Sequence, residues 1–70
     1  IEEQRRKIIQ DAINSLPEKY RVVIQMRHQE EKNYDEISEI LNMPIGAVKA
    51  HIFRAREMLN KYLKDKRVFL

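Results

Sequence analysis

Apolar residues recur along the chain at the three- and four-residue spacing of α-helices, and no stretch alternates between apolar and polar residues as a half-buried strand would. The spacing predicts four helices, separated by short segments that contain Pro, Asn or clustered charges. Their expected bounds are about Glu2–Asn14, Pro17–Gln29, Tyr34–Leu41, and Ile45 to Lys64 or beyond. We therefore expect an all-α fold of four helices.

Each predicted helix has one apolar face, which we expect to point toward a shared core. In chain order, these faces carry Ile8, Ile9, Ala12, Ile13 and Leu16; Tyr20, Val23 and Ile24; Ile37, Ile40 and Leu41; and Val48, Ile52, Ala55, Leu59 and Leu63.

Polar residues mark where the helices begin and end. Ser15 and Glu18 have the spacing of a capping box before the second helix, and Asn33 and Glu36 have it before the third. Asn42 follows the third helix at a position suited to the left-handed conformation, which Asn tolerates better than most residues.

The third and fourth helices are joined by only Asn42-Met43-Pro44, with the small Ser38 before the turn and the apolar Val48 after it. A helix-turn-helix needs a small residue at the helix crossing, a tight turn and apolar anchors on both sides. Many other αα-hairpins share parts of this pattern. The spacing therefore predicts a helix-turn-helix at about residues 34–57, in a homeodomain-like or winged-helix-like bundle.

Phe53 does not belong to the apolar stripe of the fourth helix. At about 100° per residue, it lies on the opposite, outward face with Arg54 and close to Lys49. An exposed aromatic ring can be idle or packed on another domain. The alternative is the DNA major groove, where apolar side chains contact the thymine methyl group and Arg or Lys contacts guanine.

Composition narrows the possible functions of this 70-residue chain, which is one small domain. It has no Cys, and His28 and His51 are far apart, so we expect no metal site and no cofactor. No apolar run could span a bilayer and no secretory signal is visible, which predicts a cytoplasmic protein without a membrane partner. The first residue is Ile, which suggests the C-terminal part of a longer chain, although processing would also explain it.

Charge is unevenly distributed. The net charge is +3, residues 30–39 are mostly acidic, and the chain from Lys49 onward is mostly basic. This favours an anionic partner for the last helix, with a solvated helix face as the plain alternative. The carboxylates of Asp35, Glu36 and Glu39 suit the start of a helix, and no His or Cys stands at a catalytic spacing from them. We therefore expect neither an enzyme nor a small-molecule substrate.

Two segments, "LPEKYRVVIQMR" and "YDEISEILNMPIGAVKAHIFRARE", resemble region 4 of the sigma-70 family in its extracytoplasmic-function (ECF) subgroup. The resemblance covers about Leu16 to Leu63. It implies a helical bundle whose last helix enters the major groove of the promoter −35 element and so directs transcription initiation. It also implies contacts with the RNA polymerase core, notably the β-subunit flap, and inhibition by an anti-sigma factor in many members.

The resemblance also assigns roles by position. The residues that it places at the base edges are Lys49, Ala50, Phe53 and Arg54, and those that it places at the DNA backbone are Asn33, Tyr34, Gly46, His51, Arg56 and Lys61. The chain departs from the family in several places. Asn42 replaces the usual Gly, Ala50 and His51 replace frequent Ser and Arg, and Glu31-Lys32 replaces a common Gly-Leu. These differences leave the exact base preference open.

Two other readings remain open. A LuxR-type response-regulator output domain shares the Val48-Lys49-Ala50-His51 pattern, although Leu16-Pro17 and Arg54-Ala55-Arg56 favour a sigma factor. A module that binds polymerase or an anti-sigma factor without touching DNA could use the apolar end, residues 68–70. That apolar end could equally cover the open end of the domain itself.

Overall fold

The computed structural model describes residues 2–68, and every regular element in that part of the chain is helical. The elements are α1 (Glu2–Asn14), α2 (Glu18–Ile24), a π-helical turn η1 (Gln25–Gln29), α3 (Tyr34–Leu41) and α4 (Ile45–Asp65). The predicted all-α class, with four helices and a helix-turn-helix, is confirmed. The predicted second helix is in fact two segments, because its last turn widens so that Glu30 N–H donates to the Gln25 carbonyl.

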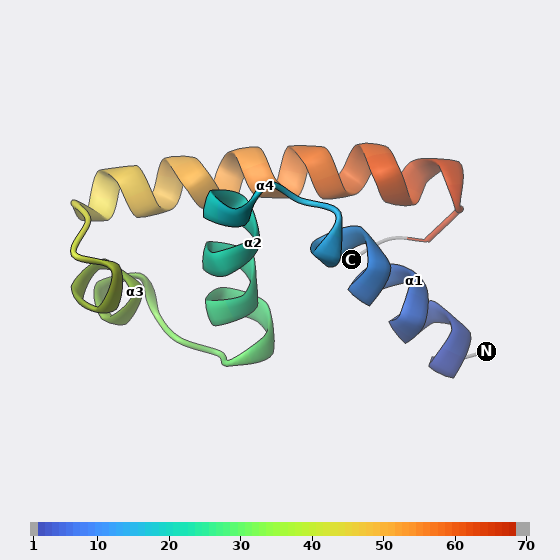
Figure 1. Cartoon of the computed structure of the whole chain (residues 1–70), viewed down its shortest axis with the longest axis horizontal. Helices are drawn as coiled ribbons and strands as arrows, with labels where there is room; N and C mark the ends of the chain where they lie inside the picture. Colours follow the sequence, from blue (N-terminus) through green and yellow to red (C-terminus); the bar gives the residue numbers. More distant parts are fainter. Residues whose placement is uncertain (1, 69–70) are drawn as a thin grey trace.

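The long helix α4 lies across the other three, which all occupy one side of it (Figure 1). The α3–α4 turn stands at one end of the molecule, and the start of α1 and the end of α4 lie toward the other. Because α1, α2 and α3 all pack against the same side of α4, the opposite side of that helix is uncovered along its whole length.

Two apolar clusters hold α4 in this position. The first joins α2, α3 and the beginning of α4 through Val23, Ile37, Val48 and Ile52. The second joins α1, α2 and the later part of α4, and its buried members are Ala12, Ile13, Leu16, Ile24, Ala55, Leu59 and Leu63. The stripe of α4 that was expected to face the core is buried along its length, and burial of these side chains fixes the rotation of the helix about its axis.

Ile40 was expected to point inward, and this prediction is wrong, because 54% of its surface is exposed. The eight-residue α3 buries the side that carries Ile37, with Ser38 and Leu41 half-buried beside it. Ile40 lies about 60° from Ile37 on the other side and therefore falls outside the contact with α4.

Ser15 was expected to cap α2, and this prediction is also wrong. The N-cap of α2 is Pro17, and no side chain caps it. Ser15 lies two residues too early to reach the free N–H groups of α2. Its hydroxyl instead donates to the Ala12 carbonyl at 2.6 Å and closes the end of α1.

The connection into and out of α3 agrees with the sequence. The Asn33 side chain accepts from Glu36 N–H at 2.8 Å, and Glu36 Oε1 accepts from Asn33 N–H at 2.9 Å, which completes the capping box. Asn42 ends the helix in the left-handed conformation at φ 53°. The Ser38 hydroxyl then donates to the Met43 carbonyl and ties the turn to the helix.

Two further residues adopt positive φ, Glu31 at 55° and Arg67 at 56°. Glu31 stands where the resembling family commonly has Gly. The backbone at this position thus has a conformation that Gly adopts without strain. At the other end of the chain, Val68 packs against the second cluster. Phe69 and Leu70 lie outside the described residues.

Candidate nucleic-acid interface

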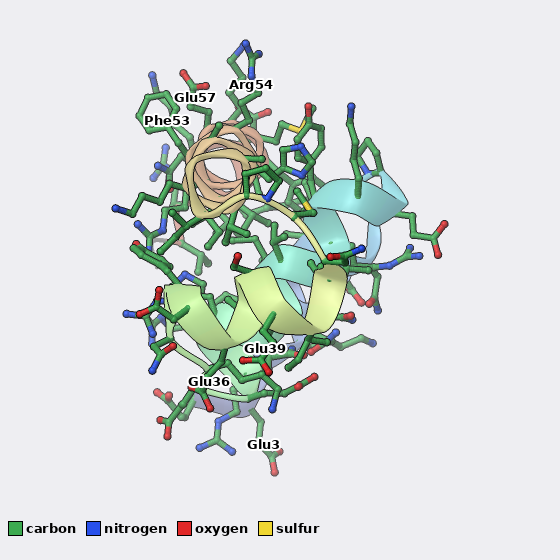
Figure 2. All side chains as sticks on the ribbon, turned by 90° about the vertical axis from the view of Figure 1, so that its left-hand side faces the viewer. Glu3, Glu36, Glu39, Phe53, Arg54 and Glu57 are labelled. Atoms are coloured by element: carbon green, nitrogen blue, oxygen red, sulfur yellow. The ribbon has the colours of Figure 1, made fainter. Side chains whose placement is uncertain are left out.

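The uncovered side of α4 carries Phe53, Arg54 and Glu57, which all extend away from the rest of the molecule (Figure 2). Phe53 is 65% exposed, so its predicted outward position is confirmed. By helical geometry, the same side also carries Gly46, Ala50 and Lys61. We call these six residues the outward ridge. No other part of the chain that the structure describes covers this ridge, and its aromatic ring and cations are therefore free to meet a partner.

At the beginning of α4 the outward ridge carries only small residues, Gly46 and Ala50. A Cβ atom added to Gly46 would meet no atom within 4 Å, and Ala50 is exposed. The helix starts after Pro44 without a side-chain cap, in contrast to the fully capped α3. Because the first N–H groups of a helix need acceptors and carry a partial positive charge, this end suits an anion such as a phosphate.

One edge of the ridge is formed by three side chains from three elements. Lys49 Nζ lies 5.8 Å from the centre of the Tyr34 ring, and the Arg27 guanidinium carbon lies 5.4 Å from the same centre. Arg27 also donates to the Lys32 carbonyl at 3.5 Å. Lys49 and Tyr34 are predicted site residues that the fold brings together, and the aromatic ring holds two cations on the same side of the molecule.

The sequence reasoning did not identify Arg27 as a site residue. Nothing in the helical periodicity shows that the second helix ends beside Tyr34. The sequence contains one hint of this contact, a cation near the end of one helix and an aromatic residue at the start of the next. This hint is weak, because it depends on how the loop between the two helices folds.

The other edge of the ridge meets α2. The His51 ring is half-buried and stands edge-on to the Tyr20 ring, with centroids 5.6 Å apart. His51 Nδ1 is buried without a hydrogen-bond partner among the described residues. A shallow groove of about 150 Å³ runs beside Tyr20 and is lined further by Arg54, Glu57, Met58 and Lys61. His51 therefore has a packing role in addition to its predicted contact with the DNA backbone.

The remaining predicted backbone contacts lie at the flanks of α4. Asn33 uses its side-chain oxygen in the capping box, which leaves its amide N–H₂ as a donor. Arg56 is half-buried on the same flank as Lys49. Partial burial lowers the pKa of His28 below its ordinary value of 6.5, and the positive charges of Arg56 and Arg27 lower this pKa further. His28 therefore adds little positive charge at neutral pH, and Arg27 and Arg56 remain the cations of this flank.

Features of other kinds of site are few. Within residues 2–68, no group of His, Asp or Glu side chains is placed to hold a metal ion. No helix in that range has the length and apolar character needed to cross a bilayer. An open cleft of about 610 Å³ lies between the start of α1 and residues 66–68, at the end of the molecule remote from the α3–α4 turn.

The chain is similar to known proteins of one family. The model of the family described as "Sigma-70, region 4" matches residues 6–59. The chain is 51% identical over 57 residues to the ECF RNA polymerase sigma factor SigW of Bacillus subtilis, covering 81% of this chain and 30% of that protein. It is 40% identical over 58 residues to the ECF RNA polymerase sigma-E factor of Haemophilus influenzae, covering 83% and 31%.

A third relative is the ECF RNA polymerase sigma-E factor of Escherichia coli K12, 40% identical over 60 residues, with 86% of this chain and 31% of the relative covered. The chain thus spans about three tenths of the length of the curated relatives that it matches. The family match covers the helix-turn-helix and every residue of the outward ridge except Lys61. The chain belongs to the sigma-70 family as a region 4 domain of the ECF subgroup.

Proposed function

We propose that this chain binds the promoter −35 element with α4 in the major groove, as the part of a sigma factor that helps to position RNA polymerase at transcription start sites. One observation carries the proposal. A 65% exposed Phe stands beside Arg54 on a helix whose opposite face is locked into two apolar clusters. The fold therefore fixes the rotation of α4 that directs Phe53 outward, and the major groove admits an α-helix.

Base reading falls to four residues near the start of the ridge. Arg54 and Lys49 can donate to guanine O6 and N7, and Phe53 can contact a thymine methyl group. Ala50 lies between them and is small enough to let the backbone approach the base edges. Along the helix axis, Ala50 and Arg54 are about 6 Å apart, which corresponds to about two base-pair steps. We therefore expect the readers to cover a short run of adjacent base pairs.

Backbone contacts fall to the two flanks and the helix start. The free N–H groups near Gly46 suit one phosphate. Arg27 and Tyr34, beside Lys49 at the edge of the ridge, suit phosphates of the strand on that flank, with Asn33 and Arg56 near them. Lys61 and His51 lie toward the α2 flank. Phosphate contacts set the position of the helix in the groove, whereas the base contacts select the sequence.

The opposite face of the molecule is unsuited to DNA. Helix α3 carries Asp35, Glu36 and Glu39 and no Lys or Arg, and Figure 2 shows Glu36 and Glu39 pointing away from the ridge. This acidic face, with the exposed Ile40, is free for protein partners. By the family resemblance, those partners are the RNA polymerase core, through its β-subunit flap, and an anti-sigma factor.

The proposal is tested by selecting duplexes from a randomised pool with the purified chain and then titrating it with the selected and a scrambled duplex. We expect a preferred sequence, and an affinity that falls steeply with salt because phosphate contacts release counterions. Binding without any sequence preference, or no salt-dependent binding, would contradict the proposal. The second outcome would favour the interaction module that never touches DNA.

The LuxR-type alternative predicts the same DNA binding and is distinguished by a different measurement. A region 4 domain is expected to associate with the RNA polymerase core, and a response-regulator output domain is expected to dimerise. Sedimentation of the chain alone and with purified core enzyme separates the two. Dimerisation without association with core would favour the LuxR-type reading.

A further inference from the structure

One residue of the outward ridge has the wrong charge for a surface that meets DNA. Glu57 lies about 80° from the direction of Lys49, close to the middle of the ridge, four residues after Phe53 and four before Lys61. Figure 2 shows it on the same side of α4 as Phe53 and Arg54. A carboxylate in this position faces the DNA if α4 lies in the groove.

The fold itself makes no use of this carboxylate. The ion pairs that join described residues are Arg5 with Glu2 and Lys32 with Glu30. Arg54 and Lys61 have helix spacings that allow pairing with Glu57, but neither lies within 4.0 Å of its oxygens. Glu57 is also in the middle of a 21-residue helix, where it gains nothing from the helix dipole. The Glu57 carboxylate is therefore available to a partner.

An ionised carboxylate can only accept hydrogen bonds, so its effect in a major groove depends on the base that it meets. The groove presents donors at cytosine N4 and adenine N6, and acceptors at guanine O6 and N7 and at thymine O4. A donor opposite Glu57 is favourable, whereas an acceptor or a nearby phosphate is repelled. The helix rise places Glu57 about 4.5 Å beyond Arg54, close to one base-pair step further along the groove.

We infer that Glu57 is a specificity-determining residue at the base pair next to the one read by Arg54. It accepts a hydrogen bond there from cytosine N4, the base donor with which Glu and Asp side chains usually pair. The same carboxylate repels α4 from any DNA sequence that places an acceptor atom of guanine or thymine opposite Glu57. Glu57 thus lowers binding to random DNA while the cations of the ridge raise it. This inference rests on the proposed function, because it requires α4 to occupy the groove.

The test compares Glu57→Gln and Glu57→Ala with the matched control Glu39→Gln. The Glu39 substitution makes the same change in net charge on the opposite side of the molecule (Figure 2). Each variant is used to select duplexes from a randomised pool, and its affinity for the wild-type selected duplex and for a scrambled duplex is measured by fluorescence anisotropy. Melting followed by circular dichroism confirms that the variants fold, as expected for substitutions on an exposed helix surface.

We expect both Glu57 variants to bind the scrambled duplex more tightly, and the selected-to-scrambled ratio to fall by about tenfold. The preference for cytosine should be lost at the position that Glu57 contacts. Gln can pair with donor and acceptor bases alike, and Ala can pair with neither. Preferences at neighbouring positions should remain, because other residues read them. Glu39→Gln should leave the ratio and every base preference unchanged.

The inference is overturned if the Glu57 variants keep the cytosine preference and the ratio, even when all duplexes bind more tightly, because the carboxylate would then act only by general repulsion. Failure of the proposed function gives a different result, in which the wild-type chain itself selects no sequence. In that case both conclusions fall together.

Discussion

The two faces of α4 differ in what they contact. The inner face, from Val48 to Leu63, is buried in both apolar clusters and determines how the helix lies on the domain. The outer face carries Phe53 and Arg54, which are exposed and extend away from the rest of the molecule. One helix therefore combines a face selected for packing with a face available for recognition, and substitutions on the two faces should have separable effects.

The largest effect is expected on the inner face. Leu59→Ala removes a fully buried side chain and should lower the free energy of unfolding by about 2–5 kcal/mol, through lost burial and the cavity that remains. In a domain of 70 residues this is a large share of the total stability. Met58→Ala, one residue away at a position 40% exposed, should change it by about 0.5 kcal/mol or less. Equal losses in urea unfolding of the two variants would contradict the assignment of the faces.

The next effect separates sequence reading from general attraction. Arg54→Ala should weaken binding to the selected duplex by about 1–3 kcal/mol, with little change for a scrambled duplex, because a guanine contact is lost. Arg56 lies on the flank of α4. Arg56→Ala should therefore weaken binding to both duplexes alike and reduce the salt slope by about one unit. Titrations at several salt concentrations measure both quantities, and the assignment fails if the two variants behave identically.

A smaller effect concerns the backbone beside the recognition unit. Glu31 is held at φ 55°, which costs a non-glycine residue about 1–2 kcal/mol. Glu31→Gly relieves this strain but gives the unfolded chain more freedom, so we expect a net gain in stability of about 0.5–1 kcal/mol. Asn42→Gly, at φ 53°, should gain less because Asn tolerates this conformation. Thermal melting compares the two, and a loss of stability in Glu31→Gly would refute the argument.

The smallest expected effect is a dependence of stability on pH through His28. Its pKa is lowered in the folded state, by burial first and then by Arg56 and Arg27, so the unfolded chain binds more protons near pH 6.5. This contribution to stability is therefore present above about pH 6.5 and is lost as the pH falls through that value toward the lower folded pKa. His28→Gln should make stability less dependent on pH in this window. An unchanged profile of unfolding free energy against pH would contradict the prediction.

Much of the fold could be predicted from the sequence, because periodicity reports how a single helix is buried. The stripe of α4, the capping box at Asn33 and the left-handed Asn42 all follow from local patterns. Ile40 was misplaced because its exposure depends on which side of α3 meets α4, which is a tertiary property. The π-helical turn η1 has no periodic signal in the sequence.

The candidate site was predictable to a similar degree. Helical geometry placed Phe53 and Arg54 outward without knowledge of the fold, and the structure agrees. The cluster of Arg27 with Tyr34 and Lys49 was not predictable, because it is assembled from three elements across the loop between η1 and α3. The packing of His51 against Tyr20 was also not predictable, because the two residues come from different helices, α4 and α2.

The central claim is that the outer face of α4 reads DNA and has no part in stability, and Phe53→Ala tests it most directly. The variant is measured twice, by urea unfolding and by titration with the selected and the scrambled duplex. We predict a free energy of unfolding within about 0.5 kcal/mol of the wild type, an unchanged salt slope, and a clear fall in the selected-to-scrambled ratio from the lost thymine methyl contact. An unchanged ratio, or a loss of stability comparable to that of Leu59→Ala, would contradict the claim.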